Sequence, residues 1–241
     1  MDLPATGEEK GIVLLVHGFA STATMNWVGT GWTQALCEAG YRVIALDNRG
    51  HGASQKFYTP EDYGPDIFAR DAFELLDHLD IGTVLLMGYS MGARISCWML
   101  HAQPERISRA VFGGMGEHIF GGRGGYEKIA AALEADDPST IADPVALSFR
   151  KFADSTGSDR KALAACIRPA RTQITPDIVK GISKPVLVAV GGRDDIAGSP
   201  QILADMMPEG EAFVIDNLDH LKATGAASYK QRVLEFFDGE N

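Results

Sequence analysis

The chain alternates short apolar runs with longer segments in which apolar residues recur at helical spacing. The predicted strands are the short runs at residues 11–17, 41–46, 83–88, 107–113, 185–190 and 212–216. Most of these runs are continuously apolar, as expected of strands buried on both faces of a sheet. The predicted helices cover residues 65–80, 91–102, 199–207 and 224–238. This order of elements predicts an α/β fold with a mainly parallel sheet and helices on both faces.

One long segment, residues 114–181, contains no convincing strand. The glycine-rich stretch GGMGEHIFGGRGGY begins just before it and is followed by short helical patterns near 126–135, 143–153 and 159–167. Ligands of open α/β sheets bind outside the carboxyl ends of the strands, so we interpret the segment as a cap over that edge. We therefore expect a single domain with a core, residues 1–113 and 182–241, and a small helical cap insertion, residues 114–181.

Composition and charge narrow the class of protein. A chain of 241 residues with 45% hydrophobic and 22% charged residues fits a globular domain with a substantial core. The net charge of −10 argues against nucleic acid and anionic membrane surfaces as partners. No apolar run approaches the roughly 18 residues of a membrane span, and the N-terminus lacks the pattern of a secretory signal. We expect a cytoplasmic protein that acts on a small molecule.

The cysteines and glycine-rich loops point to no bound metal or cofactor. Cys37, Cys97 and Cys166 are odd in number and far apart, which favours reduced thiols over a disulfide framework. There is no H-x-x-x-H pattern and no Cys/His cluster, and GGRGG at 121–125 lacks the lysine of a phosphate-binding loop. The sequence therefore predicts catalysis by side chains alone.

The strongest motif is LLMGYSMGARI, residues 85–95, which contains G-x-S-x-G as Gly88, Ser90 and Gly92 between a predicted strand and a predicted helix. A nucleophile on so tight a turn needs neighbours without side chains, because a Cβ at either glycine would clash with the turn or the helix. The turn places the Met91 N–H at the positive helix N-terminus, where an oxyanion can form. The motif therefore predicts that Ser90 is a nucleophile.

With this motif the sequence resembles the α/β-hydrolase fold family over nearly the whole chain. LLVHGF, residues 14–19, is similar to the H-G loop of the family, which implies that the Phe19 N–H is the second oxyanion donor and faces Met91. DNRGHGAS is similar to a turn of the family whose polar residues are generally structural, here Asp47, Arg49 and His51. The resemblance further implies an acid near residue 194 and a histidine near the C-terminus.

The histidine can be chosen by elimination, because a general base must reach Ser90 from a loop at the same sheet edge. Five histidines lie elsewhere, in structural motifs (His17 and His51), within helices (His78 and His101) and at the glycine-rich start of the cap (His118). Only His220 follows the last predicted strand and precedes the C-terminal helix. We predict that His220 is the base.

The acid lies in VGGRDDIAG, where two aspartates are adjacent. In the family the acid stands three residues after the glycine that ends the preceding strand. Counting from Gly191 gives Asp194, and counting from Gly192 gives Asp195. Gly191 directly follows the apolar run, so we favour Asp194 and keep Asp195 as the alternative.

Loops at the same edge are expected to form a largely apolar substrate pocket. The candidate lining residues are Met25 and Trp27 after the H-G loop, Met115, His118 and Phe120 at the start of the cap, and Arg123 as a partner for a substrate carboxylate. Loops at one sheet edge commonly bind a small, partly apolar ligand.

The sequence departs from the family at its beginning. Only about ten residues precede Gly11, too few for the antiparallel hairpin that the family usually carries there. The run 41–46 would then form a sheet edge, and either a dimer partner or the N-terminal tail is expected to cover it.

Three functions are compatible with these residues. The preferred one is a serine hydrolase that cleaves a small ester, lactone or thioester through an acyl-enzyme formed on Ser90. The same triad in a cofactor-free C–C hydrolase or lyase is the second, and a ligand-binding module without turnover is the third.

Overall fold

The computed structural model describes residues 1–121, 125–168 and 173–239. Its sheet has seven strands in the order β1-β3-β2-β4-β5-β6-β7, and all neighbours are parallel except β1 and β3. The strands are β1 Asp2–Leu3, β2 Gly11–Val16, β3 Tyr41–Leu46, β4 Val84–Tyr89, β5 Ile107–Gly113, β6 Val186–Gly191 and β7 Gly210–Ile215. The predicted mainly parallel α/β fold is confirmed.

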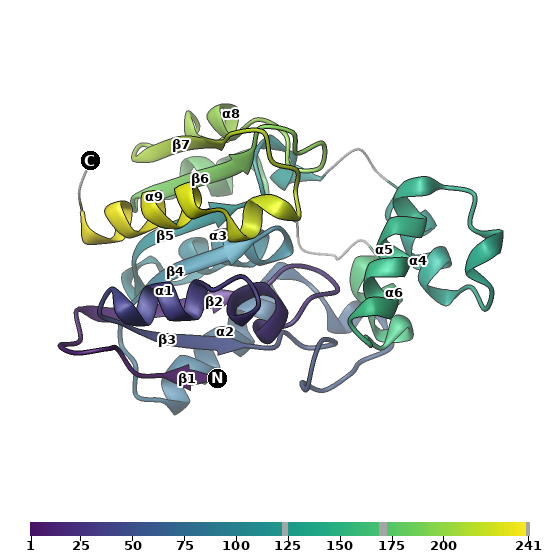
Figure 1. Ribbon diagram of the computed structural model, residues 1–241, viewed down its shortest axis with the longest axis horizontal. Helices are drawn as coiled ribbons and strands as arrows, with labels where there is room; N and C mark the ends of the chain where they lie inside the picture. Colours follow the sequence, from purple (N-terminus) through teal and green to yellow (C-terminus); the bar gives the residue numbers. More distant parts are fainter. Residues whose placement is uncertain (122–124, 169–172, 240–241) are drawn as a thin grey trace.

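Helices cover both faces of the sheet (Figure 1). On one face lie α1 Trp32–Glu38 and α9 Ala227–Asp238, and on the other lie α2 Pro65–His78, α3 Met91–Ala102, α7 Pro176–Lys180 and α8 Pro200–Ala204. The central strands β4 and β6 are buried at every position, which explains their uninterrupted apolar sequence. The short helices α1 and α7 were not predicted, and the other core helices begin within three residues of their predicted starts.

Between β5 and β6, three of the α-helices in the described residues lie to one side of the sheet (Figure 1). They are α4 Tyr126–Glu134, α5 Pro144–Ser155 and α6 Arg160–Ile167. Asp143 and Asp159 accept hydrogen bonds from the first amides of α5 and α6, as N-cap residues do. The three helices share their own hydrophobic cluster, which also includes Phe19 of the H-G loop. The cap helices therefore pack against the loop that was predicted to hold an oxyanion.

The N-terminal tail covers the edge of the sheet that the missing hairpin would leave open. In β1, Asp2 pairs antiparallel with Ile44 of β3, and the terminal amino group donates to the Ala45 carbonyl at 2.8 Å. Arg42 adds a surface ion pair with Asp2 at 2.7 Å. Of the two expectations for this edge, the N-terminal tail is the one that the structure shows.

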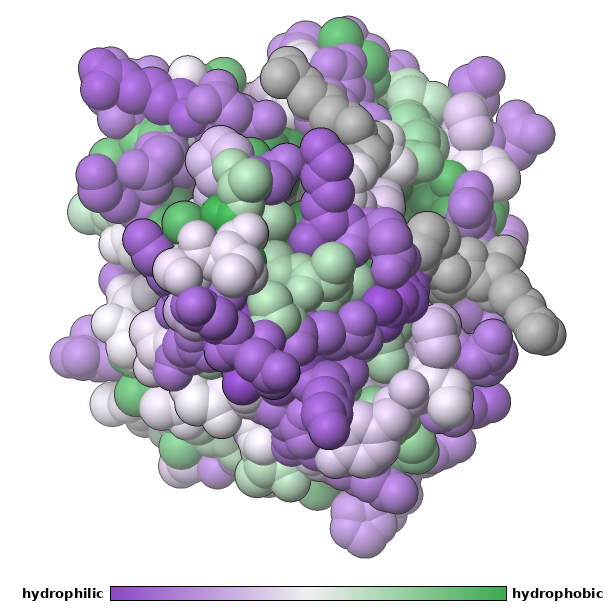
Figure 2. Space-filling view, turned by 90° about the vertical axis from the view of Figure 1, so that its right-hand side faces the viewer, coloured by the Kyte–Doolittle hydropathy of each residue, from purple (hydrophilic) through white to green (hydrophobic). Residues whose placement is uncertain are grey.

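Within the described ranges, no helix is both long enough and apolar enough to cross a membrane. The side of the molecule that carries the cap is largely hydrophilic on its outermost parts, with hydrophobic areas between them (Figure 2).

Candidate active site

Ser90 lies at the sharp turn between β4 and α3. Its backbone has φ 55° and ψ −112°, a conformation that is strained for a residue with a side chain. A Cβ at Gly88 would lie 2.2 Å from the Gly92 carbonyl oxygen, and a Cβ at Gly92 would lie 2.0 Å from the Val16 carbonyl oxygen. Both glycines are therefore required by backbone contacts, which is the geometry of a nucleophile elbow.

The H-G loop after β2 lies directly beside this turn. A Cβ at Gly18 would be 3.4 Å from the Ser90 Cβ. The Gly18 N–H donates to Asn26 Oδ1 at 3.0 Å, and His17 donates from Nδ1 to the Gly18 carbonyl at 2.8 Å. These bonds fix the loop that carries Phe19 next to Ser90.

The two aspartates of the DD pair have different environments. The Asp194 side chain is fully buried, and its Oδ2 lies 2.7 Å from His220 Nδ1. Its Oδ1 accepts from the backbone amides of Ile196 and Ala197 at 2.8 and 3.0 Å. Asp195 instead lines the cavity beside Ser90. Asp194 is thus the aspartate that contacts the predicted base.

The loop of His220 is joined to the nucleophile turn through Tyr89, the residue before Ser90. Tyr89 donates from its hydroxyl to the His220 carbonyl at 2.5 Å, and the two rings lie 5.5 Å apart. Asp219 accepts from the amides of Leu221 and Lys222, so its carboxylate caps the following turn rather than the imidazole. The structure therefore brings the loops of Ser90, Asp194 and His220 to one edge of the sheet.

Two other histidines are structural. His17 Nε2 accepts from the Asn48 amide at 2.9 Å, and the His17 and His51 rings pack edge to face with centroids 5.2 Å apart. Burial lowers the pKa of His17 to about 4 and that of His51 to about 3. Both are therefore neutral at pH 7, which agrees with the structural role that the family resemblance implied.

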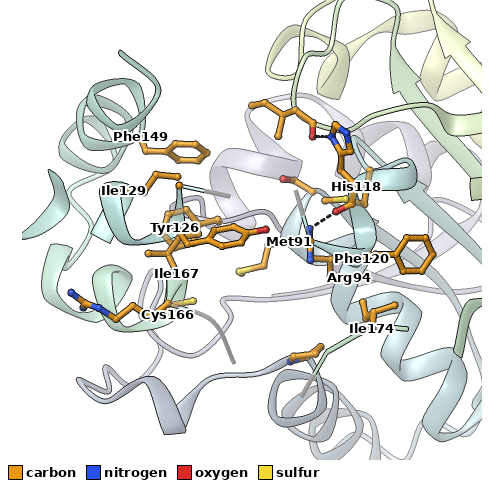
Figure 3. Close-up of a pocket in the computed structure, with 18 of the residues that line it drawn as sticks. Met91, Arg94, His118, Phe120, Tyr126, Ile129, Phe149, Cys166, Ile167 and Ile174 are labelled. Carbon is orange, nitrogen blue, oxygen red and sulfur yellow. Dashed lines mark hydrogen bonds between the residues drawn. The ribbon is translucent and has the colours of Figure 1, made fainter. Parts of the chain in front are cut away.

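Ser90 opens into a cavity of about 670 Å³ between the sheet edge and the cap helices (Figure 3). Its walls are mainly apolar. Phe68, Met91 and Ile95 come from the core, and Ile129, Phe149 and Ile167 come from the cap. Such a size and lining suit a small, largely apolar ligand.

Three of the six predicted lining residues, Met115, His118 and Phe120, line this cavity, as do Phe19 and Met91, which carry the predicted oxyanion donors. Two others, Met25 and Trp27, do not. Met25 is 40% exposed and lies outside it.

Trp27 is fully buried on the face of the sheet that α1 and α9 cover. It packs against Trp32, with ring centroids 6.5 Å apart. The expectation for Met25 and Trp27 is corrected, because the π-helical turn Thr24–Val28 directs the chain away from the cavity. Arg123 lies outside the described residues.

The cavity also contains a cationic side chain, Arg94, that was not predicted from the sequence. Arg94 lines it, and its Nη2 donates to the His118 carbonyl at 2.6 Å. Burial lowers the pKa of Arg94, and Tyr126 counteracts this effect by hydrogen bonding to the guanidinium. In Figure 3 the Tyr126 hydroxyl points from the cap toward this group. Arg94 follows Ser90 by four residues on one helix, and this spacing was the signal that could have identified it.

A search of the described ranges finds no group of three His, Cys, Asp or Glu side chains placed to hold a metal ion. The side chains that line the cavity include the Ser90 hydroxyl, the Asp195 carboxylate and two arginines, Arg94 and Arg168.

Comparisons with known proteins agree with this fold. A sequence model of the alpha/beta hydrolase fold matches residues 11–120. A dihydrolipoyllysine-residue acetyltransferase component of an acetoin cleaving system from Pseudomonas putida is 31% identical over 95% of this chain, and the chain spans 64% of that relative. A 3-oxoadipate enol-lactonase 2 from Acinetobacter baylyi is 28% identical over 86% of this chain, and the match covers 82% of the length of that relative.

Solved structures show the same architecture. A thermophilic esterase from Thermogutta terrifontis superposes with a TM-score of 0.77 at 22% identity, covering 100% of this chain and 92% of that one. The elbow at Ser90, the topology of the sheet and these matches together show that the chain has the α/β-hydrolase fold.

Proposed function

We propose that the protein is a serine hydrolase that cleaves a small ester, lactone or thioester. The observation that carries this proposal is the buried hydrogen bond of 2.7 Å between Asp194 and His220, beside a nucleophile elbow that opens into the cavity. An ionised carboxylate can only accept, so this bond requires the proton on His220 Nδ1, and in the neutral imidazole Nε2 is then the accepting nitrogen. An imidazole in this tautomer can take the proton of a serine hydroxyl.

In the proposed reaction, Ser90 Oγ attacks the substrate carbonyl carbon while His220 Nε2 takes the hydroxyl proton. The negative charge on the carbonyl oxygen is stabilised by the N–H groups of Phe19 and Met91. His220 returns the proton to the departing alcohol or thiol, which leaves an acyl-enzyme on Ser90. Water then attacks this ester, with His220 again as the base, and the acid is released. Asp194 orients the imidazole throughout.

The names of relatives support this class of reaction. The relative from Acinetobacter baylyi is named as an enol-lactonase, and the structural neighbour from Thermogutta terrifontis is described as an esterase. The cavity is large enough for a small acyl group and its leaving group, and its walls are apolar enough to exclude much of the water.

The direct test is labelling with a fluorophosphonate probe, followed by a panel of p-nitrophenyl esters, lactones and acyl thioesters. Wild-type protein should be labelled at Ser90 and should hydrolyse members of the panel, and Ser90→Ala should do neither. Folded wild-type protein that is never labelled would refute the proposal. Labelling without hydrolysis of any member would favour C–C cleavage by the same residues, and tight ligand binding unchanged by Ser90→Ala would favour a binding module.

A further inference from the structure

Arg94 is the cation in the cavity whose charge the protein leaves unbalanced. Its guanidinium contacts the carbonyl oxygen of His118 and the Tyr126 hydroxyl. Both groups are neutral oxygens and satisfy hydrogen bonds without compensating a positive charge. In the described part of the chain, no ion pair includes Arg94. The acidic lining residue Asp143 is already paired with Lys128 at 3.3 Å, and none of the described ion pairs joins Asp195 to Arg94.

Comparable arginines in this protein are paired with carboxylates. Arg168 also lines the cavity, and it bonds to Glu127 and Glu134 at 3.1 and 2.9 Å. Arg150 is buried in the cap, where it bonds to Asp154 at 2.9 Å. A buried charge is ordinarily paired, because the loss of its hydration is costly. Arg94 therefore differs from both of these arginines.

The position of Arg94 relative to Ser90 gives this difference a chemical meaning. Both line the same cavity, and they are separated by four residues at the start of α3. Ser90 is the N-cap of this helix, and Arg94 lies one turn further along, with its backbone nitrogen 3.4 Å from the Ser90 carbonyl oxygen. A ligand whose carbonyl reaches Ser90 therefore has an arginine within a few bonds of its reacting carbon. A carboxylate on that ligand would supply the missing negative charge and could accept two parallel hydrogen bonds from the guanidinium.

We propose that Arg94 is a specificity-determining residue and that the substrate is an ester, lactone or thioester that carries a carboxylate. This proposal rests on the proposed serine hydrolase function and adds to it the chemical class of the substrate. The carboxylate lies either on the acyl part or on the leaving group, and the experiment distinguishes these two sources. The apolar walls of the cavity then hold the remaining carbon chain.

The kinetic experiment compares pairs of esters in which one member carries a carboxylate and the other does not. For the acyl part the pair is the mono-p-nitrophenyl ester of glutaric acid and p-nitrophenyl valerate, and for the leaving group it is 3-carboxyphenyl and phenyl butyrate. Wild type should favour the charged member of at least one pair in kcat/KM. Arg94→Gln should reduce that preference by about 10- to 100-fold, the range expected for a charged hydrogen bond. Arg94→Lys should retain part of it.

The variants separate specificity from a purely structural role. Arg94→Gln removes the charge and retains a donating NH₂ group on a shorter side chain, whereas Arg94→Lys retains the charge. Arg168→Gln is the matched control, since it removes a second arginine from the cavity wall whose charge is already balanced by two glutamates. It should leave the charged-to-neutral ratio at the wild-type value, whatever it does to the stability of the cap.

A binding measurement keeps the inference separate from the proposed reaction. By calorimetry, wild type and Ser90→Ala should bind glutarate more tightly than the neutral glutaramide, and Arg94→Gln should lose the difference. Failure to hydrolyse any ester, with this pattern intact, would refute the serine hydrolase and leave the carboxylate site standing. Equal charged-to-neutral ratios in wild type and Arg94→Gln, or no binding of glutarate by wild type, would overturn the inference.

Discussion

Replacement of Asp194 by asparagine should abolish most of the activity, and replacement of Asp195 should not. Asp194 accepts three hydrogen bonds, one from His220 Nδ1 on Oδ2 and two from the amides of Ile196 and Ala197 on Oδ1. An asparagine has one accepting oxygen and one donating NH₂ group, so it can replace only one of the two carboxylate oxygens.

The two orientations of the amide differ in free energy. If its oxygen faced the histidine, the NH₂ group would meet two backbone N–H donors, and the amides of Ile196 and Ala197 would lose the acceptor that they share. The amide should therefore keep its oxygen on the two backbone amides and present NH₂ to His220 Nδ1. That contact requires an unprotonated Nδ1 and moves the proton to Nε2, where the ring can no longer accept one from Ser90. The same change lowers turnover by about 10⁴-fold in serine proteases, or roughly 5 kcal/mol in the barrier.

The assay is kcat toward the best ester of the panel, normalised to the concentration of sites that a fluorophosphonate titrates. Circular dichroism of Asp194→Asn controls for folding. Asp195→Asn is the matched control, because its carboxylate lines the cavity without contacting the imidazole in the described structure. If Asp194→Asn retained more than a tenth of the activity, or if both variants showed the same mild loss, Asp194 would not be the orienting acid.

Three further outcomes follow from the geometry. Burial holds the folded-state pKa of His17 near 4 and of His51 near 3, below the unfolded value of 6.5, so the unfolded chain binds more protons. The free energy of unfolding in urea should therefore fall as pH is lowered from about 6.5 to 4, by up to about 1.4 kcal/mol per pH unit for each histidine. Gly92→Ala should lose about 1–3 kcal/mol in stability from backbone overlap, whereas Gly82→Ala, which meets open space, should leave the melting temperature nearly unchanged. Tyr89→Phe removes the bond to the carbonyl of the proposed base and should cost about 1 kcal/mol in unfolding and lower kcat more than it changes KM.

The strands were predictable because burial on both faces requires continuous apolar sequence. The runs 41–46 and 107–113 coincide with β3 and β5. The missed helix α1 shows the limit of this reasoning. It has seven residues, and its N-cap is Gly31 in a left-handed conformation without a side-chain hydrogen bond, so neither periodicity nor a capping residue marked its start.

The choice between the two aspartates could not be completed from sequence. Adjacent residues after a strand differ by one step of register, and a double glycine hides where the strand ends. The structure extends β6 to Gly191, so the count of three residues leads to Asp194. The difference in environment is large, since this side chain is fully buried while Asp195 faces the cavity. The path of the loop decides between the two aspartates. The hydrogen bonds that Asp194 accepts from the amides of Ile196 and Ala197 set that path.

Trp27 and Arg94 show why some side chains can be placed from sequence and others cannot. Trp27 follows the H-G loop closely, but the chain turns through a π-helix and buries the indole on the other face of the sheet. Arg94 lies in the first turn of a regular helix that begins at Met91, directly after the nucleophile, so its position relative to the nucleophile is set by helix geometry. Spacing along a helix fixes the direction of a side chain, whereas spacing along a loop fixes only its maximum distance. The residues after a nucleophile elbow are therefore more informative about the cavity than those after the oxyanion loop, and Arg94 is the position at which this reasoning identifies a charge facing the substrate.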